Sequence, residues 1–548
     1  MTEQQNLIFG IDLGTTYSCI AYVDSADRPV TIANAEGART TPSVVFYDGE
    51  TRIVGQEAKN NAVLYPDQVV AMVKRHMGQS DWVHHYDGTD YSAEEISSYI
   101  LRKLVNDTER MLGVTVKDVV ITCPAYFGVN EREATARAGE IAGLTVRSVI
   151  NEPTAAAIAY GMHEAQEQVV LVYDLGGGTF DITMIEIKEG QINVIATGGD
   201  HNLGGRNWDE IIVNYLAEQW KELAGSNQDP LDDPETAQDL FTRAEQAKMA
   251  LTAREKTDVA VTHAGMREKV TLTRDLFDSI TANLLERTIE YTRSTLKEAE
   301  KKGIRAFDQI LLVGGSTKMP QVVKRLQAEF GLEPKFHDPD ESVAKGAALY
   351  AQKLAIGDLI RIKIEGWGIK GSATASSEMV ERAREEVADE LGLTLPSVRQ
   401  YGELDIRNVT SRSFGVIALE QRSNQEIVRN LIRVNDTVPA QSTQRFGIRE
   451  DNQENAEIRI VENIVSADQA DLDSSEQIGE ALLNLPSGLR AGAPVEITFQ
   501  LDEQGRLNAT ARELSTNQII KVDIQTTRVI SEEKLKEAID RSKQLVVS

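Results

Sequence analysis

Phe9-Gly-Ile-Asp-Leu-Gly-Thr-Thr16 recurs later in the chain as Val172-Tyr-Asp-Leu-Gly-Gly-Gly-Thr179. Each copy ends an apolar run with an aspartate, and glycines and a hydroxyl residue follow directly. Such self-similarity indicates that one structural unit occurs twice. We therefore predict two related lobes that face each other across a cleft.

A third glycine turn, Gly314-Gly-Ser-Thr317, follows the apolar run Ile310–Val313. Glycines leave backbone N–H groups unobstructed, so such turns can converge on phosphate oxygens while an aspartate holds Mg²⁺ through water. A single turn of this kind is as often an ordinary β-turn, but three at strand ends favour a phosphate site. The sequence lacks a G-x-x-x-x-G-K-[ST] loop and a G-x-G-x-x-G that opens a helix after a strand, which excludes the P-loop and dinucleotide folds.

Around these turns, from residue 7 to about residue 351, short apolar runs alternate with helical stretches. This alternation is typical of α/β sheets covered by helices on both faces. The predicted strands include Leu7–Leu13, Val119–Cys123, Val169–Tyr173 and Ile310–Val313. The predicted helices include Ala93–Leu112, Asn207–Leu223 and Leu276–Lys302.

The pattern changes after residue 351. Within Ser376–Leu391, apolar residues recur every fourth position, which predicts an inserted helix or connector. After Asn408, alternating apolar residues predict a β-rich domain with strands that include Ile427–Val434, Ala456–Ile464, Val495–Leu501 and Leu507–Ala511. The tail begins as a helix with Ser531 as its N-cap and ends within about four turns.

Length and charge limit the class of protein. The 548 residues exceed one domain of about 100–200 residues, so we expect three or four units. The net charge of −27 disfavours binding to nucleic acid or an anionic membrane. Cys19 and Cys123 stand far apart, which excludes a disulfide scaffold and a thiolate zinc site. Without a run of about 18 apolar residues, we expect a cytoplasmic protein.

Several motifs together resemble one known family. The segments are Gly10-Ile-Asp-Leu-Gly-Thr-Thr-Tyr-Ser-Cys19, Pro124-Ala-Tyr-Phe127, Asn151-Glu-Pro-Thr-Ala-Ala-Ala157, Asp174-Leu-Gly-Gly-Gly-Thr-Phe-Asp181 and Leu312-Val-Gly-Gly-Ser-Thr317. In order and spacing they resemble the signature segments of the DnaK-type seventy-kilodalton heat-shock chaperones. The resemblance is strong over residues 7–351 and moderate over 408–525.

This resemblance implies an ATP-dependent molecular chaperone, in which Mg-ATP hydrolysis controls the binding and release of unfolded polypeptide. It implies four regions: an actin-like ATPase domain with two lobes of duplicated topology (1–355), an inserted helix and linker (356–407), a β-sandwich that binds substrate (408–525) and a short helical stub (526–548). The stub is too short for the C-terminal lid of the family, so we expect a short form. Unfolded polypeptides, a J-domain co-chaperone and a nucleotide exchange factor are the implied partners.

The resemblance also implies the residues of an ATP/ADP and Mg²⁺ site. Lys74, Glu152 and Thr179 would position the attacking water and stabilise charge on the γ-phosphoryl group, with Asp12 and Asp181 beside the Mg²⁺ shell. Without the resemblance, Lys74 could be a solvated helix lysine and Glu152 a support of the strand–helix junction. The implied nucleotide-binding set is Gly14, Thr15, Thr16, Tyr17, Asp174, Gly176, Gly177, Gly178, Gly204, Gly205, Glu245, Lys248, Thr252, Gly314, Gly315, Ser316, Lys318 and Asp340.

The adenosine end departs from the family pattern. Met249 and Lys318 stand where many relatives carry arginine, and Arg206-Asn-Trp208 replaces the usual Glu-Asp-Phe. The phosphate residues are therefore the more specific part of the prediction.

The resemblance implies that the β-rich domain holds an extended peptide through main-chain hydrogen bonds and one apolar pocket. The implied peptide-binding residues are Val416, Leu419, Phe446, Arg449 and Ile458. Arg449 replaces a small residue, so we expect less basic peptides to be preferred. The alternative is a β-sandwich core without a groove.

Pro124, Arg132 and Asn408 are the implied relay between the domains. The linker Leu404-Asp-Ile-Arg-Asn408 ends in asparagine where the family has aspartate, and Ser148 replaces the arginine that meets that aspartate. We therefore expect ordinary J-domain proteins to stimulate this protein weakly. Three readings remain open beside a standard chaperone: a specialised or regulatory member with weakened coupling, a non-hydrolysing exchange factor, and a sugar or acetate kinase of similar fold.

Overall fold

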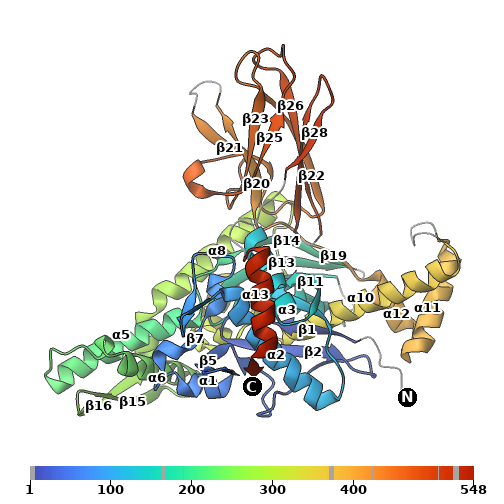
Figure 1. Cartoon of the computed structure of the whole chain (residues 1–548). Helices are drawn as coiled ribbons and strands as arrows, with labels where there is room; N and C mark the ends of the chain where they lie inside the picture. Colours follow the sequence, from blue (N-terminus) through green and yellow to red (C-terminus); the bar gives the residue numbers. More distant parts are fainter. Residues whose placement is uncertain are drawn as a thin grey trace.

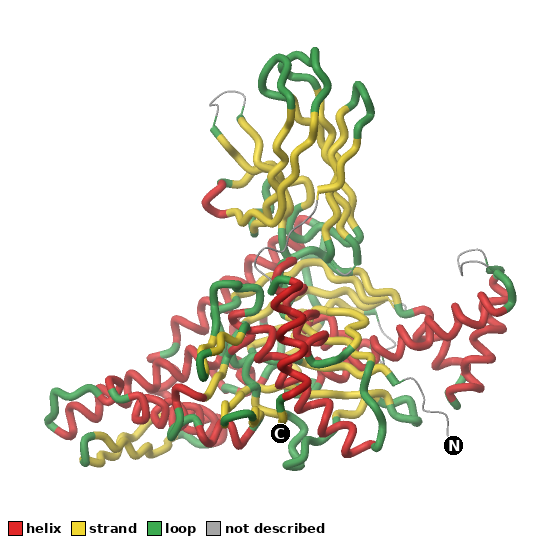
Figure 2. Tube along the Cα trace, in the orientation of Figure 1, coloured by secondary structure: helices red, strands yellow, loops and turns green. Residues whose placement is uncertain are grey.

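The computed structural model describes residues 7–162, 167–188, 191–369, 375–420, 425–503, 505–522 and 530–548. Over these residues the chain has a mixed α/β part and a β-rich part (Figure 1). Figure 2 shows that helices are confined almost entirely to the α/β part. The predicted change from α/β to β along the chain is therefore confirmed.

The repeated motif corresponds to two sheets of the same topology. In the first sheet the order is β11-β10-β1-β2-β3, and in the second it is β18-β17-β12-β13-β14-β19. Each sheet has a parallel half, β11-β10-β1 or β18-β17-β12, followed by antiparallel strands, β1-β2-β3 or β12-β13-β14, and β19 is added to the second sheet in parallel with β14. The strands are β1 Ile8–Asp12, β2 Tyr17–Val23, β3 Pro29–Thr31, β10 Asp118–Cys123, β11 Thr145–Asn151, β12 Gln168–Leu175, β13 Phe180–Lys188, β14 Gln191–Asp200, β17 Gln309–Val313, β18 Lys335–Phe336 and β19 Asp405–Arg407.

Helices cover these sheets, and most lie where the sequence predicted them. The first lobe carries α2 Ala93–Leu112, α3 Val129–Ile141 and α4 Glu152–Gly161, and the second carries α5 Gly205–Ala224, α6 Pro234–Ala253, α7 Arg274–Ile280, α8 Ala282–Lys301 and α9 Pro320–Phe330. The single helix predicted over Leu276–Lys302 is wrong, because α7 ends before Thr281. The Thr281 hydroxyl donates to Phe277 O at 2.7 Å and accepts from Gln321 Nε2 at 3.2 Å, which fixes the break.

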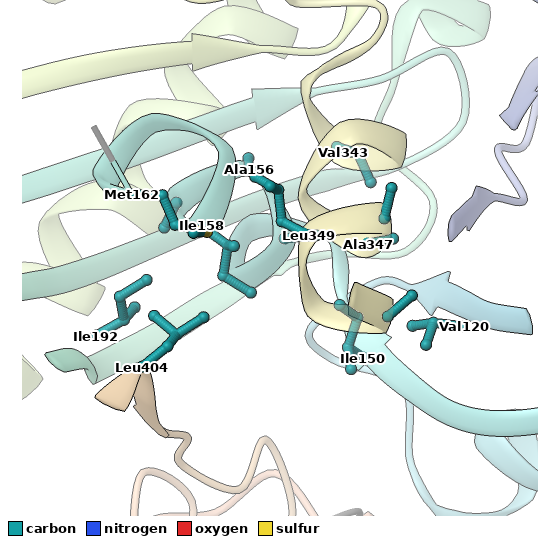
Figure 3. Close-up of a cluster of buried hydrophobic side chains, with 14 of the residues drawn as sticks. Val120, Ile150, Ala156, Ile158, Met162, Ile192, Val343, Ala347, Leu349 and Leu404 are labelled. Carbon is teal, nitrogen blue, oxygen red and sulfur yellow. The ribbon is translucent and has the colours of Figure 1, made fainter. Parts of the chain in front are cut away.

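Close helix contacts join the two sheets into one core (Figure 3). Helix α10 (Ser342–Gly366) packs against α4, and a Cβ on Gly346 would lie 1.7 Å from Ala155 O. Only glycine allows this approach. The same core contains Ile158 and Ile192, and it extends to Leu404 next to the linker strand β19. Strand β19 pairs in parallel with β14, so the linker is an edge strand of the second sheet.

The predicted boundary at residue 355 falls inside α10 (Ser342–Gly366) and stays a prediction. The helix continues to Gly366 because Ile356 and Ile364 on its later turns are both fully buried. Helices α11 (Ser377–Leu391) and α12 (Leu395–Glu403) follow and pack on α10 and on each other. The inserted helix was thus predicted with the correct position.

The β-rich part contains two packed sheets. One has the order β24-β21-β20-β23-β25 and the other β22-β26-β27-β28, with a shared apolar core between them. The strands are β20 Ser413–Leu419, β21 Glu426–Ile432, β22 Ala440–Gly447, β23 Asn455–Asn463, β24 Gln469–Ala470, β25 Ser475–Asn484, β26 Pro494–Leu501, β27 Leu507–Glu513 and β28 Ile519–Val522.

The tail lies on the first lobe, a position that the sequence did not indicate. Helix α13 (Glu532–Gln544) begins at the predicted Ser531 cap and packs against α3 and α2 (Figure 1). Strand β29 (Val546–Val547) then pairs with β6 (Thr51–Val54) in a small sheet of order β29-β6-β5-β7. Its other strands are β5 Val44–Asp48 and β7 Val69–Ala71.

Within the residues described, no helix is both long enough and apolar enough to cross a membrane.

Candidate functional site

A cavity of about 590 Å³ lies between the two lobes and is lined from both of them. It brings together most of the residues that the sequence predicted for nucleotide binding and catalysis. These are Asp12, Gly14, Thr15, Thr16, Tyr17, Lys74, Glu152, Asp174, Gly176, Gly177, Thr179, Glu245, Lys248, Thr252, Gly314, Gly315, Ser316, Lys318 and Asp340. Asp181, Gly178, Gly204 and Gly205 are not in its wall. Asp181 lies opposite Asp174 in the β12–β13 pairing, Gly204 lies against Gly178, and Gly205 lies against Ser316.

The glycine turns meet at distances that no side chain would permit. A Cβ on Gly177 would lie 2.2 Å from Thr16 Oγ1, and one on Gly178 would lie 2.4 Å from Thr15 Cγ2. The first and second turns therefore interlock across the cleft. At the third turn, Gly314 has a φ of 81°, and its Cβ would lie 2.6 Å from Asp174 Oδ1. The three turns form one backbone cradle.

Gly204 and Gly205 support this cradle from the start of α5. The Gly205 N–H donates to Gly176 O at 2.9 Å, and the next N–H, of Arg206, donates to Gly177 O at 2.7 Å. Lys248 from α6 donates to Gly205 O at 2.9 Å and pairs with Asp209 at 2.8 Å. Burial raises the pKa of Asp209 to about 6, and Lys248 opposes the rise. Asp209 was missed because it looks like an ordinary helix carboxylate.

Three aspartates lie beside the cradle: Asp174 and Asp181 are buried and Asp12 is partly buried. Burial, assisted by the charge of Glu152, raises the pKa of Asp12 to about 7, although Lys74 and a hydrogen bond from Thr122 act against this rise. The pKa values of Asp174 and Asp181 are also raised well above the ordinary value, first by burial and then by neighbouring carboxylates.

This cluster is short of positive charge. Asp181 Oδ1 accepts from Ala125 N at 3.1 Å, but its Oδ2 is buried and has no hydrogen-bond partner among the described residues. Oxygen ligands of this kind suit Mg²⁺, which usually retains several of its waters. The residues present therefore fit the predicted magnesium ion.

Lys74 and Glu152 form a buried ion pair through Lys74 Nζ and Glu152 Oε1. Lys74 lies in η2 (Val73–His76), directly after β7, and Glu152 is the first residue of α4. Burial disfavours the ammonium, but Glu152 and Asp12 outweigh burial and raise the pKa of Lys74 above its ordinary value. The interpretation of Lys74 as a solvated lysine is wrong, because its side chain is 5% exposed.

An ion pair bridges the two walls at the outer edge of the cleft. Lys59, on α1 (Gln56–Asn61), reaches across to Glu245 on α6 with a separation of 2.5 Å and donates to the Tyr17 hydroxyl at 3.1 Å. A second pair lies within the second lobe, where Lys318 after β17 pairs with Asp340 after β18 at 2.5 Å. No sequence pattern indicated Lys59, because its helix is short and polar.

Two arginines near the cradle were also missed as site residues. Arg75 donates to Gly178 O at 2.7 Å and to Asn207 Oδ1 at 3.3 Å, so it ties η2 to the second lobe. The Arg206 guanidinium lies 3.5 Å from the centroid of the Phe241 ring in the cavity wall. Arg206 and Asn207, which differ from the residues expected at these positions, therefore each make a contact at the site.

The predicted peptide-binding residues are spread between the core and the surface of the β-rich part. Val416 and Ile458 are buried in the shared apolar core, and Phe446 packs against it. Leu419 and Arg449 are exposed. Residues 421–424, in the loop between β20 and β21, lie outside the described residues. The peptide site stays a prediction.

The predicted relay lies at the contact between the two parts, which we call the junction and define by Arg132, Ser148, Asn408 and Glu462. The first three line a cavity of about 190 Å³. Thr154 Oγ1 donates to Asn408 Oδ1 at 3.0 Å, and Arg132 donates to Phe127 O at 3.1 Å and to Asn151 Oδ1. Pro124 is not in this wall, but its carbonyl accepts from Phe127 N at 3.2 Å.

Glu462, on β23, faces the N-terminus of α3 at the junction. Its Oε2 accepts from Val129 N at 3.4 Å. Burial raises the pKa of Glu462 to about 7, with Glu131 and Glu476 adding to the rise and Arg412 opposing it. The sequence did not mark Glu462, because a single glutamate at a strand end looks like a solvated residue.

Comparison with known proteins gives consistent similarities. The sequence model of the family described as Hsp70 protein matches residues 8–361 and 395–547. The unmatched stretch between them contains α11. The chain is 36% identical over 555 positions to "Chaperone protein DnaK" of Thermosipho melanesiensis, covering 99% of this chain and 84% of that protein. It is 36% identical over 540 positions to "Chaperone protein DnaK" of Halobacterium salinarum, covering 97% and 77%.

Proposed function

The chain belongs to the Hsp70 family and is an ATP-dependent chaperone, and on that premise we propose that the cleft between its lobes is the ATP site. The observation that carries this proposal is the backbone cradle of three glycine turns beside the buried Lys74–Glu152 pair. Backbone N–H groups of such turns bind phosphate oxygens. Glu245, Lys248, Ser316 and Lys318 lie along the same cavity and are placed to contact the nucleoside.

In the proposed reaction, water attacks the γ-phosphoryl group in line with the leaving diphosphate. Lys74 stabilises negative charge on that group, and Glu152 and Thr179 orient the water. Mg²⁺ beside Asp12 and Asp181 would neutralise phosphate charge when bound. Since Lys74 is buried and its pKa is raised, it stays an ammonium throughout the neutral range.

The test is phosphate release in a single turnover by Lys74→Ala. We expect the rate to fall by about 100-fold or more, while the protein still binds ADP. Lys363→Ala is the matched control, because Lys363 pairs with Glu390 away from the cleft and its loss should leave the rate unchanged. Equal rates in Lys74→Ala and the parent protein would contradict the catalytic assignment.

We further propose that the β-rich part binds unfolded polypeptide and that the junction links its affinity to the nucleotide. Support comes from the linker strand β19, which joins the second sheet, and from the contacts of Arg132 and Asn408. This proposal includes J-domain and exchange-factor partners and a cytoplasmic location. It also includes the regions 1–355, 356–407, 408–525 and 526–548, with the first break moved beyond α10. An unfolded peptide should accelerate ATP hydrolysis in the whole chain and not in a chain that ends at Gly366.

One observation favours a specialised member. The charge pair expected at Ser148 and Asn408 is absent, and Asn408 bonds the neutral Thr154 instead. A chaperone of this kind would hydrolyse ATP but respond weakly to general J-domain proteins.

A further inference from the structure

The small sheet β29-β6-β5-β7 carries two cations of the cleft. Strand β6 ends at Val54, and after Gly55 the chain enters α1, which holds Lys59. Strand β7 ends at Ala71, and after Met72 the chain enters η2, which holds Lys74. The position of this sheet therefore sets where both side chains stand.

The tail completes this sheet as an added edge strand. Val546 and Val547 lie opposite Thr51 and Arg52 in parallel register. Ser548 N donates to Arg52 O at 3.1 Å, and Val54 N donates to Ser548 O at 2.9 Å. The second of these bonds reaches the last residue of β6, immediately before the turn into α1.

Side chains of α2 hold the tail in this position. Arg102 donates to Leu545 O at 3.2 Å, and Asn106 donates to Val547 O at 3.3 Å. The Val547 side chain is 4% exposed and belongs to the core of the first lobe, whereas Val546 points outward and is 62% exposed. The strand is thus bound by its backbone and by one buried side chain.

Helix α13 anchors the other end of the tail on the body of the first lobe. Arg541 donates to both oxygens of Glu95 on α2, at 3.1 and 2.8 Å, and Glu95 is almost fully buried. Leu535 and Ala538 pack with Ile141 of α3. The tail therefore connects α2 and α3 of the lobe to the small sheet (Figure 1).

Lys59, on α1 just after β6, bridges the two lobes at the edge of the cleft. Its bonds to Glu245 and Tyr17 join the first lobe to α6 and to the end of the first glycine turn. Lys59, Glu245 and Tyr17 all line the cavity, so this pair spans its opening on that side. An edge strand adds backbone hydrogen bonds and burial to a sheet, so its loss leaves β6 and the attached α1 less fixed.

We propose that β29 is a positioning element of the nucleotide cleft: by completing the small sheet it holds Lys59 against Glu245 and slows the release of bound nucleotide. The proposal rests on the cleft being the ATP site. It assigns the tail a task on the ATPase lobe, separate from any closure over a peptide.

Val547→Asp tests the proposal by placing a charge in the buried position of β29. We expect the dissociation rate of a fluorescent ADP to rise by about fivefold or more. Val546→Asp is the matched control, because it puts the same charge on the exposed side of the same strand and should change the rate by less than about twofold. Val547→Ile keeps an apolar side chain at the buried position and should leave the ADP dissociation rate at the value of the parent protein.

A double-mutant cycle with Lys59→Ala separates positioning from general loss of stability. If β29 acts through Lys59, Val547→Asp should not raise the dissociation rate further when Lys59 is already alanine. Additive effects would contradict the proposed route. A chain ending at Gln544 lacks β29 and should show the same rise in ADP dissociation rate as Val547→Asp. It provides the test if the Val547→Asp variant does not fold.

Hydrogen exchange of the Val54 amide reports whether the strand has detached. Loss of its protection together with an unchanged ADP dissociation rate would overturn the proposal. Failure of the parent protein to bind ADP would contradict the assignment of the cleft itself, and the proposal with it.

Discussion

The cleft and the junction both gather buried carboxylates, but they compensate the charge differently. In the cleft, Asp12, Asp174 and Asp181 lie near a buried lysine, Lys74, which is paired with Glu152. At the junction, Glu462 lies with Glu131 and Glu476 close to one cation, Arg412. Burial raises the pKa of Asp12, Asp174 and Asp181 in the cleft and that of Glu462 at the junction.

The difference shows what each cluster is suited to bind. In the part of the chain that the structure describes, Asp181 Oδ2 has no hydrogen-bond partner, and a glycine cradle lies beside the aspartates, so a hydrated cation with phosphate would complete the cleft. Glu462 instead faces the backbone N–H of Val129, and a proton is enough to relieve its charge. We therefore expect the cleft to bind a ligand and the junction to be a contact whose strength depends on pH.

The largest effect is expected from Glu152→Gln in the cleft. The substitution keeps the shape but removes the negative charge that pairs with Lys74 and that we propose orients the water, so single-turnover hydrolysis should fall by about 100-fold. ADP affinity should change little, because the glycine cradle is intact. Glu140→Gln, on the surface of α3, is the control. A fall in ADP affinity equal to the fall in rate would assign Glu152 to binding instead.

The second effect concerns pH at the junction. In the docked arrangement burial raises the pKa of Glu462 to about 7, so we expect this arrangement to bind more protons than the separated parts and to be favoured as pH falls. We expect the docking equilibrium to strengthen by about tenfold as the pH falls from about 8 to about 6 and to change little above about pH 8, where Glu462 is ionised in both arrangements. Glu462→Gln should dock well at both pH values.

Energy transfer between two dyes measures this equilibrium. Cys19 and Cys123 are buried, so the dyes can be attached to Met111→Cys on α2 and Leu482→Cys on β25, which are exposed positions. If docking of the parent protein does not change with pH, protonation of Glu462 does not control docking. The same conclusion holds if the Glu462→Gln variant retains the pH dependence.

The cleft was largely predictable from the sequence, and the junction was not. The glycine turns and Asp12, Asp174 and Asp181 belong to local motifs in which a strand end, a turn and a ligand group are neighbours in the chain. Their chemistry is visible within eight residues of sequence. In the structure these motifs meet around one cavity, as the sequence predicted.

The residues that were missed depend on partners far away in the chain. The contacts are Glu462 with Val129, Lys59 with Glu245, and Arg541 with Glu95. In each pair the two residues are far apart in the sequence, and no local pattern predicts that they meet. Alone, each is a charged residue on a helix or strand, for which a solvated position is the ordinary expectation. The tail was predicted as a helix because its capping residue is a local signal. Its docking was missed because docking depends on residues far away in the chain.

Arg412→Gln sharpens the comparison by removing the cation near Glu462. Because Arg412 lowers the pKa of Glu462, its loss should raise that pKa further and move the pH dependence of docking upward. Docking should weaken several-fold at about pH 8, where Glu462 is charged, and less at about pH 6. Arg445→Gln is the control, since Arg445 pairs with Glu496 on the exposed sheet. Equal weakening at both pH values would mean that Arg412 acts through Glu131 alone.

The smallest effect is expected from rebuilding the missing charge pair as Ser148→Arg with Asn408→Asp. Both positions line the junction cavity, and Asn408 now accepts a hydrogen bond from Thr154, which an aspartate can also accept. A new pair in this partly enclosed space should raise stimulation of ATP hydrolysis by a general J-domain protein by about twofold to fivefold over the weak response expected of the parent. Each single substitution should give less, because it leaves one charge without its partner. Strong stimulation of the parent protein by the same J-domain protein would show that the junction already transmits the signal through its neutral hydrogen bonds, and that charge there serves docking and not signalling.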